Sequence, residues 1–308
     1  MTEIPDNWLT FAWAGWSLRI PPEWRPLGIA GKAKEGSVLL GEGYHERMRV
    51  QWLTPRWTPL GFRPKRWVRS QLRTMAGWGA IQDDGPDPEG FTERAFAPQG
   101  KRAHHRAGWC GWHERAGLGV LVTLRTEDQA AVGCIHERIL PSLRAGGSDE
   151  PTDWSLLEAS FRTPAGMGLV GHQLNVGDLS IVVGARGRRM LVRQVYPADI
   201  ALGRRTLENW LTYPPVQGVW RLGKDMNFHD WSATVEGRRC EGLIRTVPKR
   251  VKFPMNWLPR RSSTAACVVD PQRNRLLMAE YDQRGLGDEA PVREAIEAMN
   301  HLAPKGRD

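Results

Sequence analysis

The chain has few cysteines and none of the common catalytic signatures. Its four cysteines, in 308 residues, show no C-x-x-C spacing, and widely separated cysteines favour single buried thiols in a reducing compartment. The sequence contains no G-x-x-x-x-G-K-[ST], H-E-x-x-H or G-x-S-x-G motif, so the phosphate loop, the zincin-type zinc site and the nucleophile elbow have no support. We therefore expect no enzyme activity, no cofactor and no catalytic or metal-binding residues.

Long apolar runs are missing as well. No stretch approaches 18 consecutive apolar residues, and the first residues, M-T-E-I-P-D-N-W, contain acidic side chains and no apolar segment of the kind found in signal peptides. The sequence therefore predicts a cytoplasmic protein without a transmembrane segment. The preference for arginine over lysine is typical of a bacterial protein from a GC-rich genome.

A related pattern occurs twice along the chain. S-L-R-I-P-P at Ser17 is matched by S-F-R-T-P-A at Ser160, 143 residues later, and R-M-R-V at Arg47 is matched by R-M-L-V at Arg189, 142 residues later. A nearly constant offset indicates an internal duplication. We predict a first repeat over 1–146, a linker over 147–153, and a second repeat over 154–308 with a basic insertion near 244–263.

Each repeat combines alternating strands with two helical segments. Residues 47–53 and 189–196 alternate apolar and polar side chains, which predicts half-buried strands. Apolar stripes predict helices over 64–78 and 127–143 in the first repeat, and over 204–211 and 290–302 in the second. Strands joined by tight turns indicate antiparallel pairing, so we expect an α+β fold: two α/β sandwiches, each an antiparallel sheet with its mid-helix and C-terminal helix on one face.

The segment from Trp16 to Trp24, W-S-L-R-I-P-P-E-W, is followed by a hairpin, an alternating strand, a helix, a second hairpin and a closing helix. This order resembles the PsbP-like α/β/α fold, which includes photosystem extrinsic proteins and chaperones of type VI secretion effectors. The second repeat departs from the pattern, with Met167 in place of the second Trp. The resemblance implies an accessory or chaperone-like role without catalysis.

Tryptophan is unusually frequent. Fifteen Trp residues occur in the chain, ten of them before residue 150. Trp anchors many protein interfaces, because it combines a large apolar area with one hydrogen-bond donor. Most of these residues are expected in the cores, and the hypothesised partner-binding set is Trp8, Trp13, Trp57, Trp78 and Trp257.

Positive charge is concentrated late in the chain. The net charge is +9, and residues 238–261 contain eight basic residues against one acid, Glu241. Such a patch suits an acidic partner or nucleic acid, although a solvated loop has the same composition. The hypothesised anion or nucleic-acid patch is Arg238, Arg239, Arg245, Lys249, Arg250, Lys252, Arg260 and Arg261.

One group has zinc-ligand chemistry: His104, His105, Cys110 and His113. Positions 110 and 113 point to opposite faces of a strand, and no second cysteine pair completes the set. Buried Cys110 beside surface histidines explains the same residues without a metal.

These features favour a non-enzymatic protein-interaction module, such as an adaptor, a chaperone-like protein or an accessory subunit. It would bind a protein partner through a Trp-rich surface or a groove between the repeats. The alternative is a nucleic-acid-associated accessory protein that uses residues 238–261, with Phe253 and Trp257 available for stacking. An enzyme of unrecognised type is a third possibility, and the sequence does not fix the oligomeric state.

Overall fold

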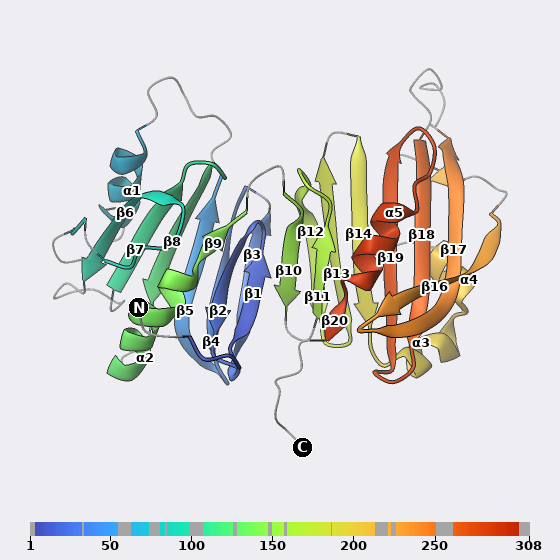
Figure 1. Ribbon diagram of the computed structural model, residues 1–308, viewed down its shortest axis with the longest axis horizontal. Coiled ribbons are helices and arrows are strands. Elements are labelled where there is room, and N and C mark those ends of the chain that lie inside the picture. Colours follow the sequence, from blue (N-terminus) through green and yellow to red (C-terminus); the bar gives the residue numbers. More distant parts are fainter. Residues whose placement is uncertain are drawn as a thin grey trace. The chain divides into compact units, whose positions relative to one another are not determined.

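The computed structural model describes most of the chain in thirteen segments: residues 4–32, 34–54, 63–73, 81–83, 85–98, 107–125, 128–146, 150–156, 159–185, 187–212, 221–222, 226–250 and 261–301. The chain divides into two compact units (Figure 1). Unit 1 is formed mainly by Met1–Asp149 and unit 2 mainly by Ala159–His301. Strand β10 (Thr152–Leu156) begins within the predicted linker.

Unit 1 is built around one antiparallel sheet with the strand order β3-β4-β5-β8-β7-β6. Its strands are β3 (Trp24–Lys32), β4 (Glu35–Glu42), β5 (His45–Leu53), β6 (Phe91–Pro98), β7 (Ala107–His113) and β8 (Leu118–Leu124). Three shorter strands, β1 (Leu9–Trp13), β2 (Trp16–Ile20) and β9 (Arg144–Ala145), pair in the order β1-β2-β9.

The helical segments of unit 1 are short. Helix α1 (Pro64–Arg73) packs on β6 and β7. Helix α2 (Gln129–Cys134) begins at Asp128, whose side chain accepts a hydrogen bond from the backbone N–H of Ala130 at 2.9 Å, as a helix N-cap does. It continues into the π-helical turn Ile135–Ile139 and the 3-10 turn Leu140–Ser142.

Unit 2 has a corresponding antiparallel sheet with the order β12-β13-β14-β19-β18-β17-β15, and β16 also pairs with β17. Its strands are β12 (Gly168–Asn175), β13 (Asp178–Ala185), β14 (Arg188–Val195), β15 (Arg221–Leu222), β16 (Phe228–Val235), β17 (Arg238–Arg250), β18 (Arg261–Asp270) and β19 (Arg275–Arg284). Strand β11 (Ala159–Thr163) pairs with β20 (Asn300–His301).

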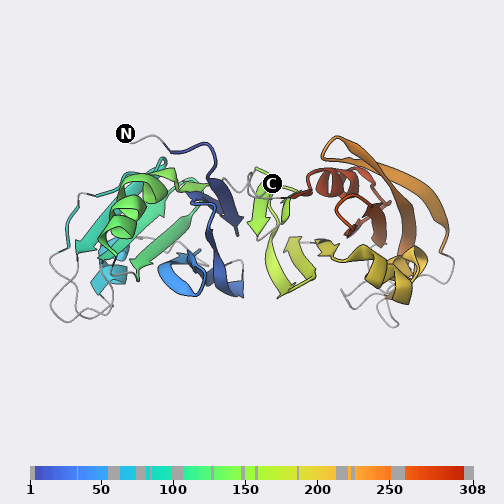
Figure 2. The ribbon, with the colours of Figure 1, turned by 90° about the horizontal axis from the view of Figure 1, so that it is seen from below.

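Three short helices accompany the unit 2 sheet: α3 (Ala198–Arg204), α4 (Leu207–Thr212) and α5 (Ala290–Glu297). Figure 2 shows α5 on one face of the sheet and α3 and α4 on the other. Helix α5 contacts β18 and β19 from one face. From the other face, α3 contacts β19 and α4 contacts β17 and β18.

The two main sheets share their strand order and their register. In unit 1, Val50 of β5 pairs with Val122 of β8; in unit 2, Val192 of β14 pairs with Ala279 of β19. Cys110 pairs with Leu121 across β7 and β8. In the same way, Cys267 pairs with Met278 across β18 and β19. Cys267 lies 157 residues after Cys110, and Met278 lies 157 residues after Leu121. Equivalent positions in the two units can therefore be compared residue by residue.

The tryptophans fill much of the interior. Trp13, Trp16, Trp52, Trp109 and Trp154 are among the largest fully buried side chains. The rings of Trp16 and Trp52 lie 6.1 Å apart in unit 1, and Trp52 donates from Nε1 to the carbonyl of Lys32 at 3.0 Å. Large rings that bury their area and satisfy their N–H make effective core residues.

The expected α+β fold, with helices on one face of each sheet, was wrong. Antiparallel strands make up more than half of the described residues, the helices span 6–10 residues, and those of unit 2 lie on both faces of its sheet. The stripe at 127–143 is matched by the helical run from Gln129 to Ser142, and the stripe at 64–78 begins with α1, after which residues 74–78 lie outside the described residues. The stripe at 204–211 belongs to two helices with a break at Arg205 and Thr206, and 290–302 ends in strand β20. Of the predicted basic insertion near 244–263, residues 244–250 lie in β17 and 261–263 in β18, and residues 251–260 lie outside the described residues.

Candidate functional site

Each main sheet carries a pocket beside a helix that contributes a tryptophan. In unit 1 the pocket includes Gln51 of β5 and Trp67 of α1. In unit 2 it includes Arg193 of β14 and Trp210 of α4. Gln51 and Arg193 are separated by the repeat offset of 142 residues, so the pockets occupy equivalent places with different side chains.

The unit 2 pocket, which we call the Trp210 pocket, has a volume of about 330 Å³. This is near the lower end for pockets that bind small groups. Strand β14 contributes Arg193 and Val195, α3 contributes Ile200 and Arg204, and Arg205 and Trp210 complete this part of the lining. The pocket thus combines three guanidinium groups with apolar walls.

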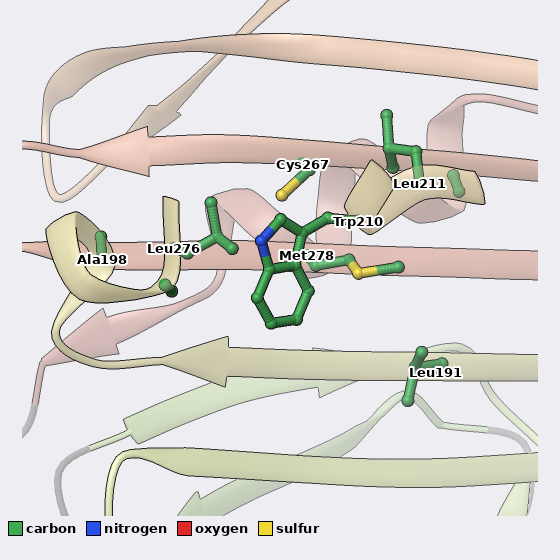
Figure 3. Close-up of a cluster of buried hydrophobic side chains, with 9 residues drawn as sticks. Leu191, Ala198, Trp210, Leu211, Cys267, Leu276 and Met278 are labelled. Carbon is green, nitrogen blue, oxygen red and sulfur yellow. The ribbon is translucent and has the colours of Figure 1, made fainter. Parts of the chain in front are cut away.

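Trp210 lies within the buried cluster between the sheet and the two helices (Figure 3). Its side chain is 9% exposed. The guanidinium carbon of Arg193 lies 4.8 Å from the indole ring centroid, and that of Arg205 lies 5.7 Å away. Both distances are within the range for cation–π attraction. The buried Nε1–H of Trp210 has no hydrogen-bond partner among the described residues.

The three arginines differ in how their charge is balanced. Arg193 makes two hydrogen bonds to the carboxylate of Asp178, at 2.8 and 2.6 Å, so this charge is compensated. The side chains of Arg204 and Arg205 form no ion pair or hydrogen bond with any residue that the structure describes. The pocket therefore offers an acidic ligand two guanidinium groups without an acidic partner in the described chain.

A buried polar cluster holds α4, and with it Trp210, against the sheet. Arg245 of β17 is fully buried and donates from Nε to the carbonyl of Leu211 in α4. Its Nη2 lies 3.4 Å from Oε1 of Glu280 in β19, and Ser263 of β18 donates to the same oxygen. The cluster fixes the helix to three neighbouring strands, because Arg245, Ser263 and Glu280 come from β17, β18 and β19 and are linked by these hydrogen bonds.

The unit 1 pocket, about 400 Å³ in volume, has a different character. No basic residue of the described chain lines it, and its polar lining includes Gln51, Gln71 and Glu35. Trp67 lies against Gly119, where an added Cβ would come within 1.9 Å of the ring. The equivalent residue in unit 2 is Leu276, which packs in the cluster around Trp210. This exchange shows that the two helices approach their sheets differently.

A third cavity, of about 740 Å³, lies in unit 1 and contains Arg19, Arg138 and Arg144. Two of these arginines are already bound by the protein. Arg19 donates to the carbonyl of Trp8 at 2.8 Å, and Arg144 donates to the carbonyls of Pro141 and Leu143 and pairs with Glu89. This cavity therefore offers less unbalanced charge than the Trp210 pocket.

The hypothesised Trp surface receives no support from the described residues. Trp13 is fully buried and Trp8 is 9% exposed, so both are largely covered by the rest of the protein. Trp57, Trp78 and Trp257 lie outside the described residues. A partner could not reach Trp13 without unfolding part of unit 1.

The hypothesised basic patch is divided by the fold. Arg245 belongs to the buried cluster, Arg261 of β18 is mostly buried with its Nε 3.7 Å from Asp282, and Arg238 pairs with Glu236 at 2.8 Å. Arg239 is exposed and pairs with Glu241 at 2.8 Å. Lys249 and Arg250 lie in β17, but their side chains are outside the description, as are Lys252 and Arg260 entirely. Arg245 is thus a structural residue and cannot contact nucleic acid.

The hypothesised zinc group is not assembled in the described residues. Cys110 is buried, and Nδ1 of His113 accepts a hydrogen bond from the N–H of Ala116 at 3.1 Å. His104 and His105 lie outside the described residues. In the part of the chain that is described, no group of three or more metal-ligating side chains is placed to hold an ion.

Sequence reasoning missed Arg193, Arg204, Arg205 and Trp210. The pair Arg204–Arg205, five to six residues before Trp210, was a local signal, but a continuous helix over 204–211 places these residues along one element. The break between α3 and α4 instead lets Trp210 face the guanidinium of Arg205.

The comparisons with known proteins assign no family. No protein-family model matches the chain, and no curated protein matches it significantly. Among the described helices, none is long and apolar enough to cross a membrane.

Proposed function

We propose that this chain is a non-enzymatic protein-interaction module, an adaptor or accessory subunit that binds a protein partner beside the Trp210 pocket. The observation that carries the proposal is the exposed apolar rim of this pocket. Tyr196 is 53% exposed and Ile200 is 55% exposed, and both line the pocket. Exposed apolar groups at the edge of a concave site are typical of protein-binding surfaces.

The rim extends to a neighbouring hairpin. The N–H of Tyr196 donates to the carbonyl of Gly177 at 2.7 Å, in the turn between β12 and β13. The adjacent residue in this turn, Val176, is fully exposed. The ring of Tyr196 and the aliphatic side chains of Val176 and Ile200 are thus exposed to solvent. They lie directly after β14, in the β12–β13 turn and in α3, respectively.

The rim is held in place by hydrogen bonds to another turn. Asn274, between β18 and β19, accepts from the N–H of Ala198 at 2.7 Å through its carbonyl, and from the N–H of Asp199 at 3.0 Å through Oδ1. Its Nδ2 donates to the carboxylate of Asp199 at 2.9 Å. Because the first turn of α3 is fixed, Ile200 is presented with little entropy left to lose on binding.

We place this activity in the cytoplasm. All four cysteines are described and all are free thiols, which supports a reducing compartment.

The test is site-specific photo-crosslinking in the cells that produce the protein. Benzoylphenylalanine replaces Tyr196, and in a matched control it replaces Tyr44, a 98% exposed tyrosine in the β4–β5 turn of unit 1. We expect one protein to be crosslinked in stoichiometric yield from position 196 and not from position 44. Ile200→Asp, combined with the probe at 196, should abolish that adduct.

Two results would contradict the proposal. Equal adduct patterns from positions 196 and 44 would show that the rim has no particular partner. An adduct that persists unchanged in Ile200→Asp, with the variant folded by circular dichroism, would show that the apolar rim does not contribute to binding.

A further inference from the structure

We propose that the Trp210 pocket recognises an acidic peptide segment of the partner, in which a carboxylate side chain stands next to an apolar one. The carboxylate pairs with Arg204 and Arg205, and the apolar side chain lies along Trp210 and Ile200. This inference rests on the proposed function and names the chemistry by which the partner is recognised.

The charges of the pocket favour an acidic ligand. Arg193 is neutralised by Asp178, but Arg204 and Arg205 have no acidic partner in the described part of the chain. No acidic residue of the described chain lines the pocket. Guanidinium groups bind carboxylates through paired N–H donors and are weakly hydrated, so two of them beside an apolar wall favour a carboxylate over a neutral group.

The indole N–H of Trp210 favours a ligand with an oxygen atom. Its side chain is nine-tenths buried, and its Nε1–H has no partner among the described residues. The nitrogen lies on the edge of the ring that faces Leu276 and, beyond it, Ala198 of α3 (Figure 3). Helix α3 forms another wall of the pocket through Ile200 and Arg204. A buried donor without an acceptor costs free energy, and a carboxylate or peptide carbonyl that displaces the side chains covering this nitrogen would remove that cost.

The equivalent pocket of unit 1 differs in charge from the Trp210 pocket. Both sheets have a pocket at this place, but only that of unit 2 carries arginines among its described lining residues. Gln51 stands at the position of Arg193, and the unit 1 pocket contains Glu35. The positive charge is therefore not a property of the shared fold but of this one site, as expected if unit 2 alone takes the acidic segment.

The size of the pocket limits the ligand. A volume of about 330 Å³ holds one or two side chains rather than a folded surface. A short extended segment fits, with its remaining residues crossing the exposed rim at Tyr196.

The experiment measures peptide binding to the purified full-length protein by isothermal titration calorimetry and ligand-observed NMR. The probes are acetyl-Glu-Leu-Glu-amide, its neutral analogue acetyl-Gln-Leu-Gln-amide, and inorganic phosphate. We expect the acidic peptide to bind at least about tenfold more tightly than the neutral one at low salt, and to weaken as salt is raised.

The variant that tests the arginines is Arg204→Gln/Arg205→Gln, and both side chains are exposed enough to leave the fold intact. Its matched control is Arg188→Gln/Arg284→Gln, which removes the same charge from exposed residues of unit 2 outside the pocket. We expect about a tenfold or greater loss of acidic-peptide affinity in the first variant and less than about a twofold change in the control.

Three outcomes overturn the inference. The neutral peptide could bind as tightly as the acidic one, the two double variants could behave alike, or phosphate could displace the acidic peptide at equal concentration, which would identify a general anion site. The proposed function has a separate readout. If the crosslinked adduct at position 196 survives in Arg204→Gln/Arg205→Gln, the partner binds through the rim alone, and only the acidic-segment inference fails.

Discussion

Arg245 and Glu280 form a buried ion pair, with Nη2 of the arginine 3.4 Å from Oε1 of the glutamate and both side chains almost completely covered. Arg245 also donates to the carbonyl of Leu211, next to Trp210. The pair therefore links the centre of the unit 2 sheet to the helix that forms the candidate pocket.

Replacement of Arg245 by Met should destabilise unit 2 strongly. It leaves Glu280 buried without its cation, and breaking a buried pair in this way costs about 3–5 kcal/mol. The double variant Arg245→Met/Glu280→Leu removes both charges and should recover part of the loss. Urea unfolding followed by circular dichroism measures both, and a double variant less stable than Arg245→Met would contradict this account.

Trp210 and Trp231 form a natural pair for testing the unpartnered indole. Each has an arginine over its ring, with Arg293 at 4.7 Å from the Trp231 centroid, but Nε1 of Trp231 donates to Glu289 at 2.8 Å. Trp231→Phe loses a hydrogen bond to a charged group, worth about 1.5–3 kcal/mol. Trp210→Phe loses no hydrogen bond, so its unfolding free energy should fall by less. Equal losses in urea unfolding would show that the Trp210 indole is satisfied in solution.

The sequence predicted local elements more successfully than side-chain environments. The alternation at 47–53 lies within β5, and the alternation at 189–196 lies in β14 up to Val195. Both predictions depend on local periodicity. These signals act over a few residues and are visible in any single chain.

The basic segment shows why the candidate site was not predicted. The sequence places Arg245 and Arg261 in a basic patch, because their partners, Glu280 and Asp282, lie 35 and 21 residues away in β19. A charged residue can be buried when a neighbouring strand supplies the counter-charge. Periodicity contains no information about that pairing, nor about the break between α3 and α4 that turns Trp210 toward Arg205.

Asp270 predicts a pH dependence of stability. Burial by itself raises the pKa of this carboxyl group, but the hydrogen bonds from Arg275 and from the N–H of Arg273, with the charges of Arg275 and Arg238, outweigh burial and hold the pKa below its ordinary value. Because the pKa is lower in the folded state, the stabilisation is present above the unfolded value of about 3.9 and is lost as pH falls through the folded value.

The variant Asp270→Asn checks this dependence. At pH 7 it replaces the charged partner at 2.8 Å from the buried guanidinium of Arg275 by a neutral amide, with Glu236 still 3.5 Å away, and should lower the free energy of unfolding by about 1.5–3 kcal/mol. The difference from the unmodified protein should narrow as pH falls from about 4 toward the lower folded-state pKa of Asp270, because the carboxyl group is protonated first in the unfolded state and then in the folded state as well. Unfolding free energies from urea titrations between pH 7 and pH 3 give the result, and a constant difference across this range would contradict the assignment.

The equivalent cysteines predict an order of thiol reactivity. Burial raises the pKa of the thiols of Cys110 and Cys267, which lie at matching positions on β7 and β18 and are fully buried. Burial also raises the pKa of Cys134, but its side chain is only partly covered. Only the thiolate is alkylated, so the reaction needs both access and ionisation. We expect iodoacetamide at pH 8 to modify Cys134 first, and Cys110 and Cys267 only at the rate at which their sheets open.

Peptide mapping by mass spectrometry resolves the four sites, and Cys134→Ser serves as the control that removes the fast one. The comparison between Cys110 and Cys267 reports on the two sheets separately, because each thiol lies in the interior of its own unit. If urea unfolds unit 2 first, as expected in the Arg245→Met variant, Cys267 should become reactive at a lower urea concentration than Cys110. Simultaneous exposure of both thiols in that variant would show that the units unfold together. The loss of unfolding free energy caused by Arg245→Met would then apply to the whole chain and not to unit 2 alone.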